Sequence, residues 1–191
     1  GSGTFLQEML LLGYKNIIGW DVEQKAIDDT RENLEWLRTG LLRSARNDIS
    51  ERLVKSDART LSAKISYKTI DAIVTEPYLG SPKTRFFTPE QIQKEVKKLE
   101  DLYLTVFAEF KKILRDDGVV VIIFPVFRFK DQFYKLEILN QLKELGFTTD
   151  EFIKKRVKGE EILKLQITDR GSVVYFRPGQ SVSREIFIFT S

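Results

Sequence analysis

Two hydrophobic patterns alternate along the 191-residue chain. Short segments with strand patterns cover residues 17–20, 51–56, 71–75 and 119–124, and the last of these is a continuous apolar run. Apolar residues at three- and four-residue spacing predict helices over 4–12, 23–42, 133–145 and from Pro89 onward. The last part is richer in strand patterns, at 150–157, 163–167, 172–176 and 184–190. This alternation predicts an α/β fold with a mostly parallel sheet and helices on its faces.

The helix after Thr88 has the clearest boundaries. Thr88 is a predicted N-cap, Pro89 takes the first helical position, and Gln91 completes a capping box. The pair Asp117-Gly118 ends the helical pattern. The apolar face, which we expect in the core, consists of Leu99, Leu102, Tyr103, Val106, Phe107, Phe110 and Leu114.

Composition restricts the chemistry that this chain performs. It is 42% hydrophobic and 31% charged, as in ordinary globular proteins, and its formal charge of +3 permits a polyanionic partner without requiring one. It contains no cysteine and no histidine, which excludes disulfides, Cys/His zinc sites and a histidine base. We therefore predict no metal and acid–base chemistry by carboxylates, Tyr, Lys or the backbone.

No apolar run spans a membrane and no signal peptide is visible, so the sequence predicts a cytoplasmic protein with no membrane partner.

Acidic residues follow three predicted strands in succession. They are Asp21, Asp57 and Glu76, and ligands of α/β sheets bind at the carboxyl ends of the strands. The segment Gly1-Ser2-Gly3 precedes the first helix, whose N-terminus and backbone amides suit a close approach to a cofactor. The spacing suggests that Asp21 accepts from a ribose diol and Asp57 from an adenine amino group. Two plainer interpretations remain: such acids also cap helices, and Gly-Ser-Gly is also typical of a cloning remnant.

The segment Glu76-Pro77-Tyr78 carries the sharpest chemical pattern. Methyl transfer to an exocyclic amine of a base needs an acceptor that orients the amine and a flat surface that holds the extruded base. A carboxylate, a rigid proline and an aromatic ring supply both within three residues. The alternative is a strand-to-loop turn with a packed tyrosine.

The loop over 79–88 combines basic and aromatic residues, among them Lys83, Arg85 and Phe86. Basic groups there are candidates for holding phosphates, and phenylalanine rings for stacking on a base. The alternative is that the aromatic residues pack beneath the following helix.

Residues 1–37, 71–80 and 170–189 together carry a resemblance to a known family. The first segment resembles the cofactor-binding half of class I methyltransferases, in particular the RNA methylase family that includes tRNA guanine exocyclic-amine methyltransferases. DAIVTEPYLG stands where that family carries its Asp/Asn-Pro-Pro-Tyr motif, and RGSVVYFRPGQSVSREIFIF resembles its closing strands. The resemblance implies a Rossmann-like fold with antiparallel C-terminal strands, S-adenosylmethionine as the cofactor and guanine in tRNA as the target.

The resemblance also implies roles for individual residues. Glu76, Pro77 and Tyr78 would be catalytic, and Lys83, Arg85 and Phe86 would contact the substrate. The cofactor-binding set would comprise Gly1, Ser2, Gly3, Asp21, Val22, Asp57, Ala58 and Glu76.

Two departures from the family pattern matter. Glu76 replaces the usual Asp or Asn, and Tyr78 comes one place early; aligning that tyrosine instead puts Thr75 at the acidic position. Family members also have a strand before the glycine loop, beside the strands that end at Asp21 and Glu76, and this sequence starts at Gly1. We therefore expect one methyltransferase domain over 1–191 that is a fragment of a longer protein, or in which a swapped or permuted strand fills the gap. An RNA-binding domain lies upstream in related tRNA enzymes.

Two other functions remain open at this point. The same Pro-Tyr chemistry serves amino-methyltransferases of DNA that act on adenine or cytosine, although no target-recognition segment is visible. The altered motif and the absent strand are also compatible with a non-catalytic, cofactor-binding subunit.

Overall fold

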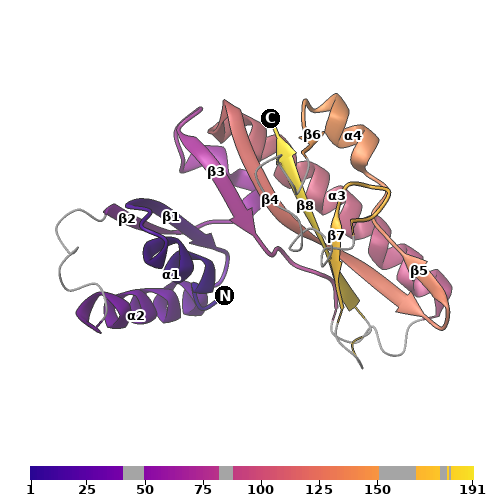
Figure 1. Ribbon diagram of the computed structural model, residues 1–191, viewed down its shortest axis with the longest axis horizontal. Helices are drawn as coiled ribbons and strands as arrows, with labels where there is room; N and C mark the ends of the chain where they lie inside the picture. Colours follow the sequence, from indigo (N-terminus) through magenta and orange to yellow (C-terminus); the bar gives the residue numbers. More distant parts are fainter. Residues whose placement is uncertain (41–49, 82–87, 151–166, 177–179, 181) are drawn as a thin grey trace, which may run out of the picture. The chain divides into compact units, whose positions relative to one another are not determined.

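The computed structural model describes residues 1–40, 50–81, 88–150, 167–176, 180 and 182–191. The chain divides into two compact units, Gly1–Ser66 and Tyr67–Ser191. Figure 1 draws the first unit in indigo to purple and the second from magenta to yellow. Each unit contains its own sheet and its own covering helices, and the predicted alternation of helices and strands is found in both.

The first unit is a small parallel α/β element. Its elements are α1 (Thr4–Leu11), β1 (Asn16–Asp21), α2 (Gln24–Gly40), β2 (Ser50–Lys55) and a 3₁₀ helix (Ala58–Ala63). β1 pairs with β2 in parallel, from Asn16 opposite Ser50 to Asp21 opposite Lys55. The helices and the sheet share an aliphatic core built on Leu10, Ile17, Leu34 and Leu37. Parallel pairing aligns the carboxyl ends of the two strands, so the residues that follow them emerge at one edge.

The second unit contains most of the strands. Its elements are β3 (Ile70–Thr75), α3 (Pro89–Ile113), β4 (Leu114–Phe129), β5 (Gln132–Tyr134), α4 (Leu139–Glu144), β6 (Thr148–Thr149), β7 (Val173–Tyr175) and β8 (Val182–Thr190). Within the described residues they form one sheet in the order β3-β4-β8-β6, with β5 added to β4 and β7 to β8. β3 and β4 are parallel, whereas β8 is antiparallel to β4, β6 and β7. The predicted antiparallel C-terminal strands are therefore confirmed.

α3 covers one face of this sheet (Figure 1). Its predicted capping box is present: the Thr88 hydroxyl accepts from the Gln91 amide at 3.4 Å, and the Gln91 side chain accepts from the Thr88 amide at 2.9 Å. Its buried rings pack edge-on against rings of the sheet, with 5.1 Å between the centroids of Tyr103 and Phe124. The fully buried aromatic residues are Tyr103, Phe107, Phe110, Phe124, Phe127, Phe147, Phe187 and Phe189.

β8 alternates strictly between the two faces of the sheet. Ser183, Glu185, Phe187 and Phe189 are buried, and the residues between them are half-buried. Successive side chains of a strand point to opposite faces, so Arg184 and Glu185 lie on opposite sides of the sheet. This alternation places two charged residues in very different surroundings.

Two predicted elements differ from the structure. β4 is longer than the apolar run 119–124, because it begins directly after α3 and continues to Phe129. Lys130, with φ of 53°, then turns the chain so that β5 pairs back onto the end of β4. The helix predicted over 133–145 was therefore wrong in its first half, and α4 covers only Leu139–Glu144. Most of the strands predicted at 150–157 and 163–167 lie outside the described residues.

The described strands fall into two sheets, β1-β2 and the sheet that contains β3. In the described part of the chain, β1 and β3 each have a strand partner along one edge only. Separately, none of the described helices is long and apolar enough to cross a membrane.

Candidate functional site

The glycine loop at the start of the first unit packs closely on α2. Gly3 is the N-cap of α1 with φ of 79°, a left-handed conformation that favours glycine. A Cβ at Gly3 would come within 2.5 Å of Thr30 Cγ2. The Thr30 hydroxyl lies 3.1 Å from the Gly1 carbonyl oxygen, and the side-chain amide of Asn33 donates to the Ser2 carbonyl at 3.0 Å. The loop therefore requires glycine and has a fixed backbone at the N-terminus of a helix.

Asp21 lies at the carboxyl end of β1. One carboxylate oxygen accepts a hydrogen bond from the Glu23 amide at 2.9 Å. Val22, the next residue, has an exposed apolar side chain. A carboxylate acceptor and an apolar side chain are therefore adjacent at this strand end.

Asp57 lies at the same edge, two residues after Lys55, the β2 partner of Asp21. It caps the 3₁₀ helix that begins at Ala58 and accepts from the Arg59 amide at 2.9 Å. The Arg59 guanidinium also pairs with it at 2.6 Å, and this side-chain hydrogen bond lowers the pKa of Asp57. Asp57 thus has the helix-capping contact that was the alternative interpretation of this residue.

In the second unit, Glu76 follows β3 and is held by an arginine from a distant part of the chain. Arg184 on β8 donates from Nε to Oε2 at 3.1 Å and from Nη2 to Oε1 at 2.8 Å. The Glu76 side chain is 34% exposed and the Arg184 side chain is 31% exposed. Sequence reasoning missed Arg184, because no local pattern links residues 108 positions apart.

Buried and half-buried groups hold the turn that follows Glu76. The Tyr103 hydroxyl lies 3.2 Å from the Tyr78 carbonyl oxygen, and the Ser81 amide donates to Glu95 at 3.1 Å. Gly80 has φ of 100°, and a Cβ there would lie 3.0 Å from the Phe127 ring. Burial, with a contribution from the negative charge of Glu76, raises the pKa of Tyr103 far above its ordinary value, so its hydroxyl stays neutral. The Tyr78 ring itself is 57% exposed, unlike the packed tyrosine of the alternative interpretation.

The remaining predicted residues are distributed as follows. Pro77 lies between Glu76 and Tyr78 in this turn, whereas Lys83, Arg85 and Phe86 lie outside the described residues.

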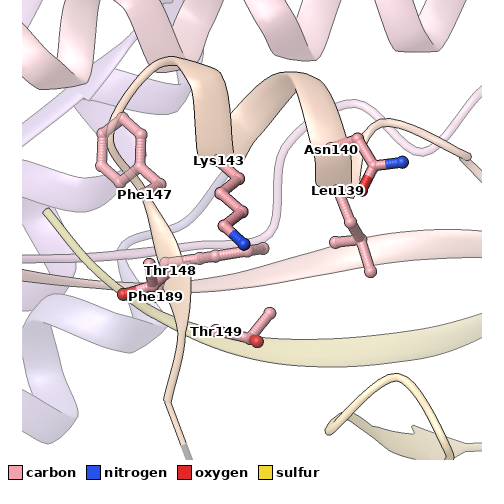
Figure 2. A pocket seen from close by; sticks show the side chains of 7 residues that line it. All are labelled: Leu139, Asn140, Lys143, Phe147, Thr148, Thr149 and Phe189. Atoms are coloured by element: carbon pink, nitrogen blue, oxygen red, sulfur yellow. The ribbon is translucent and has the colours of Figure 1, made fainter.

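A shallow pocket of about 260 Å³ lies between α4, β6 and β8 (Figure 2). Its lining contains none of the predicted site residues and consists of Leu139, Asn140, Lys143, Phe147, Thr148, Thr149 and Phe189. Within the described residues, no cluster of three or more acidic side chains is arranged to hold a metal ion.

Comparison with known proteins gives matches among solved structures. The chain is similar to TrmN from Thermus thermophilus, with 17% identity, a TM-score of 0.57, and coverage of 100% of this chain and 41% of that one. It is similar to NSun6 from Pyrococcus horikoshii solved with SFG, with 16% identity, a TM-score of 0.59, and coverage of 95% and 43%. It is also similar to TYW2 from P. horikoshii in complex with MeSAdo, with 11% identity, a TM-score of 0.51, and coverage of 95% and 50%.

These likenesses concern the fold. No family model matches the chain, and no curated protein matches it by sequence. The chain spans about two fifths of the length of TrmN and of NSun6. Its parallel β1-β2 and β3-β4 pairs, covering helices and antiparallel closing strands give it the Rossmann-like fold of class I methyltransferases, as the sequence predicted.

Proposed function

We propose that this chain is a methyltransferase domain that uses S-adenosylmethionine to methylate an exocyclic amine of a nucleic-acid base, guanine in tRNA. The observation that carries the proposal is the position of Asp21, Asp57 and Glu76, each at the carboxyl end of a parallel strand in this fold. Ligands of open α/β sheets bind at these strand ends. Three acidic residues placed there in succession match the acceptors that an adenosyl group and an amine require.

The edge of the first unit fits the cofactor in chemical terms. Gly1 and Gly3 have no side chains and Ser2 has only a small one, so the backbone at the start of α1 would be accessible to the cofactor, while Gly3 packs against Thr30 too closely for a Cβ. Asp21 would accept from the two ribose hydroxyls, with Val22 beside the sugar. Asp57, next to Ala58, would accept from the adenine amino group. NSun6 and TYW2, solved with the S-adenosylmethionine analogues SFG and MeSAdo, have this fold.

The turn in the second unit would act on the base. When bound, S-adenosylmethionine supplies an activated methyl group for direct in-line transfer. Glu76 would accept hydrogen bonds from the target amine, orient its lone pair and stabilise the positive charge that develops on the nitrogen. Tyr78, with its exposed ring, would pack against the base, and Pro77 would keep the two side chains at a fixed spacing.

Further parts of the proposal concern residues that the structure does not describe. Lys83, Arg85 and Phe86 would contact the phosphates and bases of the substrate. We also propose that the domain belongs to a longer protein and that further strands pair with β1 and with β3, since each has one edge without a strand partner in the described residues.

Calorimetric titration of S-adenosylhomocysteine tests the cofactor site directly. We expect binding to the wild-type chain and a loss of at least tenfold in affinity in Asp21→Ala, about 1.4 kcal/mol. Asp29→Ala is the matched control, because this exposed carboxylate of the same unit pairs only with Lys25 among the described residues. Equal losses in both variants would contradict a role of Asp21 in the site.

A methyl-incorporation assay tests the substrate. We expect the full-length protein to transfer labelled methyl groups from S-adenosylmethionine to tRNA, and Glu76→Gln to lower the rate roughly a hundredfold or more. Transfer to duplex DNA instead would favour the DNA amino-methyltransferase alternative. Cofactor binding without transfer to either nucleic acid would favour a non-catalytic subunit.

A further inference from the structure

The Glu76 carboxylate is held at both of its oxygens by one side chain. Arg184 Nε and Nη2 contact Oε2 and Oε1 at 3.1 and 2.8 Å, the two-point geometry in which the guanidinium and carboxylate planes match. A glutamate side chain has several rotatable bonds, so an unpaired carboxylate at a strand end samples many orientations. Two simultaneous hydrogen bonds to a planar partner select one of them.

The backbone of Arg184 is held in place by its neighbours in the sheet. β8 is paired on both sides, with Pro125 of β4 and Tyr175 of β7 opposite Arg184. The next residue, Glu185, is completely buried and bonded to Arg170 and Ser172. The guanidinium therefore extends from a strand whose position is fixed across the sheet. It reaches Glu76 over β4, which lies between β8 and β3 in the strand order.

The pairing leaves the carboxylate able to bind a further group. Each carboxylate oxygen has two acceptor positions, and Arg184 occupies one on each oxygen. Among the described residues, Arg184 leaves the other position on each oxygen available to accept a hydrogen bond from an amine N–H. An exposed ion pair contributes little to stability, so a purely structural role explains the geometry poorly.

We propose that Arg184 is a positioning residue that fixes the Glu76 carboxylate in the orientation required to receive the target amine. This inference rests on the proposed function of Glu76 and adds to it the group that makes the acceptor effective. Arg184 acts through Glu76 and need not touch the base.

A double-mutant cycle on methyl transfer to tRNA tests this role in the full-length protein. We expect Arg184→Gln to lower kcat about ten- to a hundredfold with little change in KM, as expected when a reacting group is misplaced. In the Glu76→Gln background, Arg184→Gln should cause no further loss, because its effect passes through the carboxylate. Arg184→Lys should recover part of kcat, since a lysine keeps the charge but not the two-point geometry.

Arg115→Gln is the matched control. Arg115 forms a more exposed pair with Asp71 near the opposite end of β3, with side chains 54% and 75% exposed, and its loss should leave kcat unchanged. Additive losses in the Arg184 and Glu76 variants, or an unchanged or higher kcat in Arg184→Gln, would overturn the proposal.

A second readout does not depend on activity. In nitrogen NMR spectra of arginine side chains, the Arg184 Nε–H resonance should be resolved in the wild type and move to the free-arginine position in Glu76→Gln. An unmoved resonance would overturn the proposal even if tRNA is methylated. A wild-type protein that methylates no nucleic acid would overturn the proposed function, while the NMR measurement would still decide whether Arg184 holds Glu76.

Discussion

Two neighbouring residues of β8 form arginine–glutamate pairs in opposite surroundings. Glu185 points into the core and pairs with Arg170, with exposed side-chain fractions of 0% and 15%. Arg184 points to the other face and pairs with Glu76, with fractions of 31% and 34%. The same two functional groups are thus used once inside the molecule and once at a strand end.

The interior pair belongs to a closed network. Arg170 donates to Glu185 at 3.0 Å and to the Leu136 carbonyl at 2.5 Å, and Ser172 donates to the second Glu185 oxygen at 2.7 Å. The Arg170 guanidinium also lies over the Phe187 ring. Both oxygens of Glu185 are bonded and it is out of contact with water, so this pair joins the 167–173 turn to β8.

The exposed pair differs because its carboxylate remains accessible. Solvent screens exposed ion pairs, which commonly contribute about 0–1 kcal/mol, whereas breaking a buried pair costs about 3–5 kcal/mol. The comparison teaches that the buried pair specifies structure, and that the value of the exposed pair lies in the orientation of Glu76. Three predictions test this difference.

The largest effect is expected at the interior pair. Arg170→Ala leaves the buried Glu185 charge without its cationic partner, and we expect it to lower the free energy of unfolding by about 3–5 kcal/mol. Urea denaturation followed by circular dichroism measures this loss. The double variant Arg170→Met with Glu185→Leu should recover most of it, because both charges are then removed together. If Arg170→Ala lowered the free energy of unfolding less than Arg184→Gln does, the conclusion that the buried pair specifies structure would be contradicted.

A smaller effect is expected at Tyr103, which supports the exposed pair from the interior. Tyr103→Phe removes the hydroxyl that lies 3.2 Å from the Tyr78 carbonyl oxygen and should cost about 1 kcal/mol of stability. Since the turn that carries Glu76 is then less well held, we also expect methyl transfer to fall. Tyr134→Phe is a suitable control, because that exposed hydroxyl bonds only Gln132 in the described part of the chain. Wild-type activity in Tyr103→Phe would show that the turn does not depend on this support.

The elements that sequence predicted well are those with local signals. The capping box at Thr88 and the face of α3 with Tyr103 and Phe107 come from contacts a few residues apart. The helix prediction after Phe129 was wrong because Phe133, Leu136 and other apolar residues have helical spacing there. Tertiary pairing of β5 with β4 overrode that pattern, although Leu136 is indeed fully buried.

The candidate site shows the same division. Asp21, Asp57 and Glu76 were predicted as strand-end acids because each directly follows a predicted strand. Arg184 was not, because its contact with Glu76 depends on the register of β8 against β4, with Arg184 opposite Pro125. A shift by one residue would turn Glu185 outward and Arg184 into the core. Sequence patterns identify the faces of a strand, but not its register against a distant partner.

The smallest effect is the salt dependence of the two pairs. The Debye length falls from about 10 Å at roughly 0.1 M salt to about 3 Å at roughly 1 M, so exposed charges are screened while buried ones are screened much less. Between these concentrations, we expect the coupling energy of Arg184 and Glu76 to fall from about 0.5 kcal/mol towards zero. The coupling of Arg170 and Glu185 should keep most of its value. Double-mutant cycles from urea denaturation at both concentrations measure the two couplings. If the two coupling energies fell equally with salt, solvent would screen both pairs alike. The distinction between a structural buried pair and an exposed pair would then be contradicted.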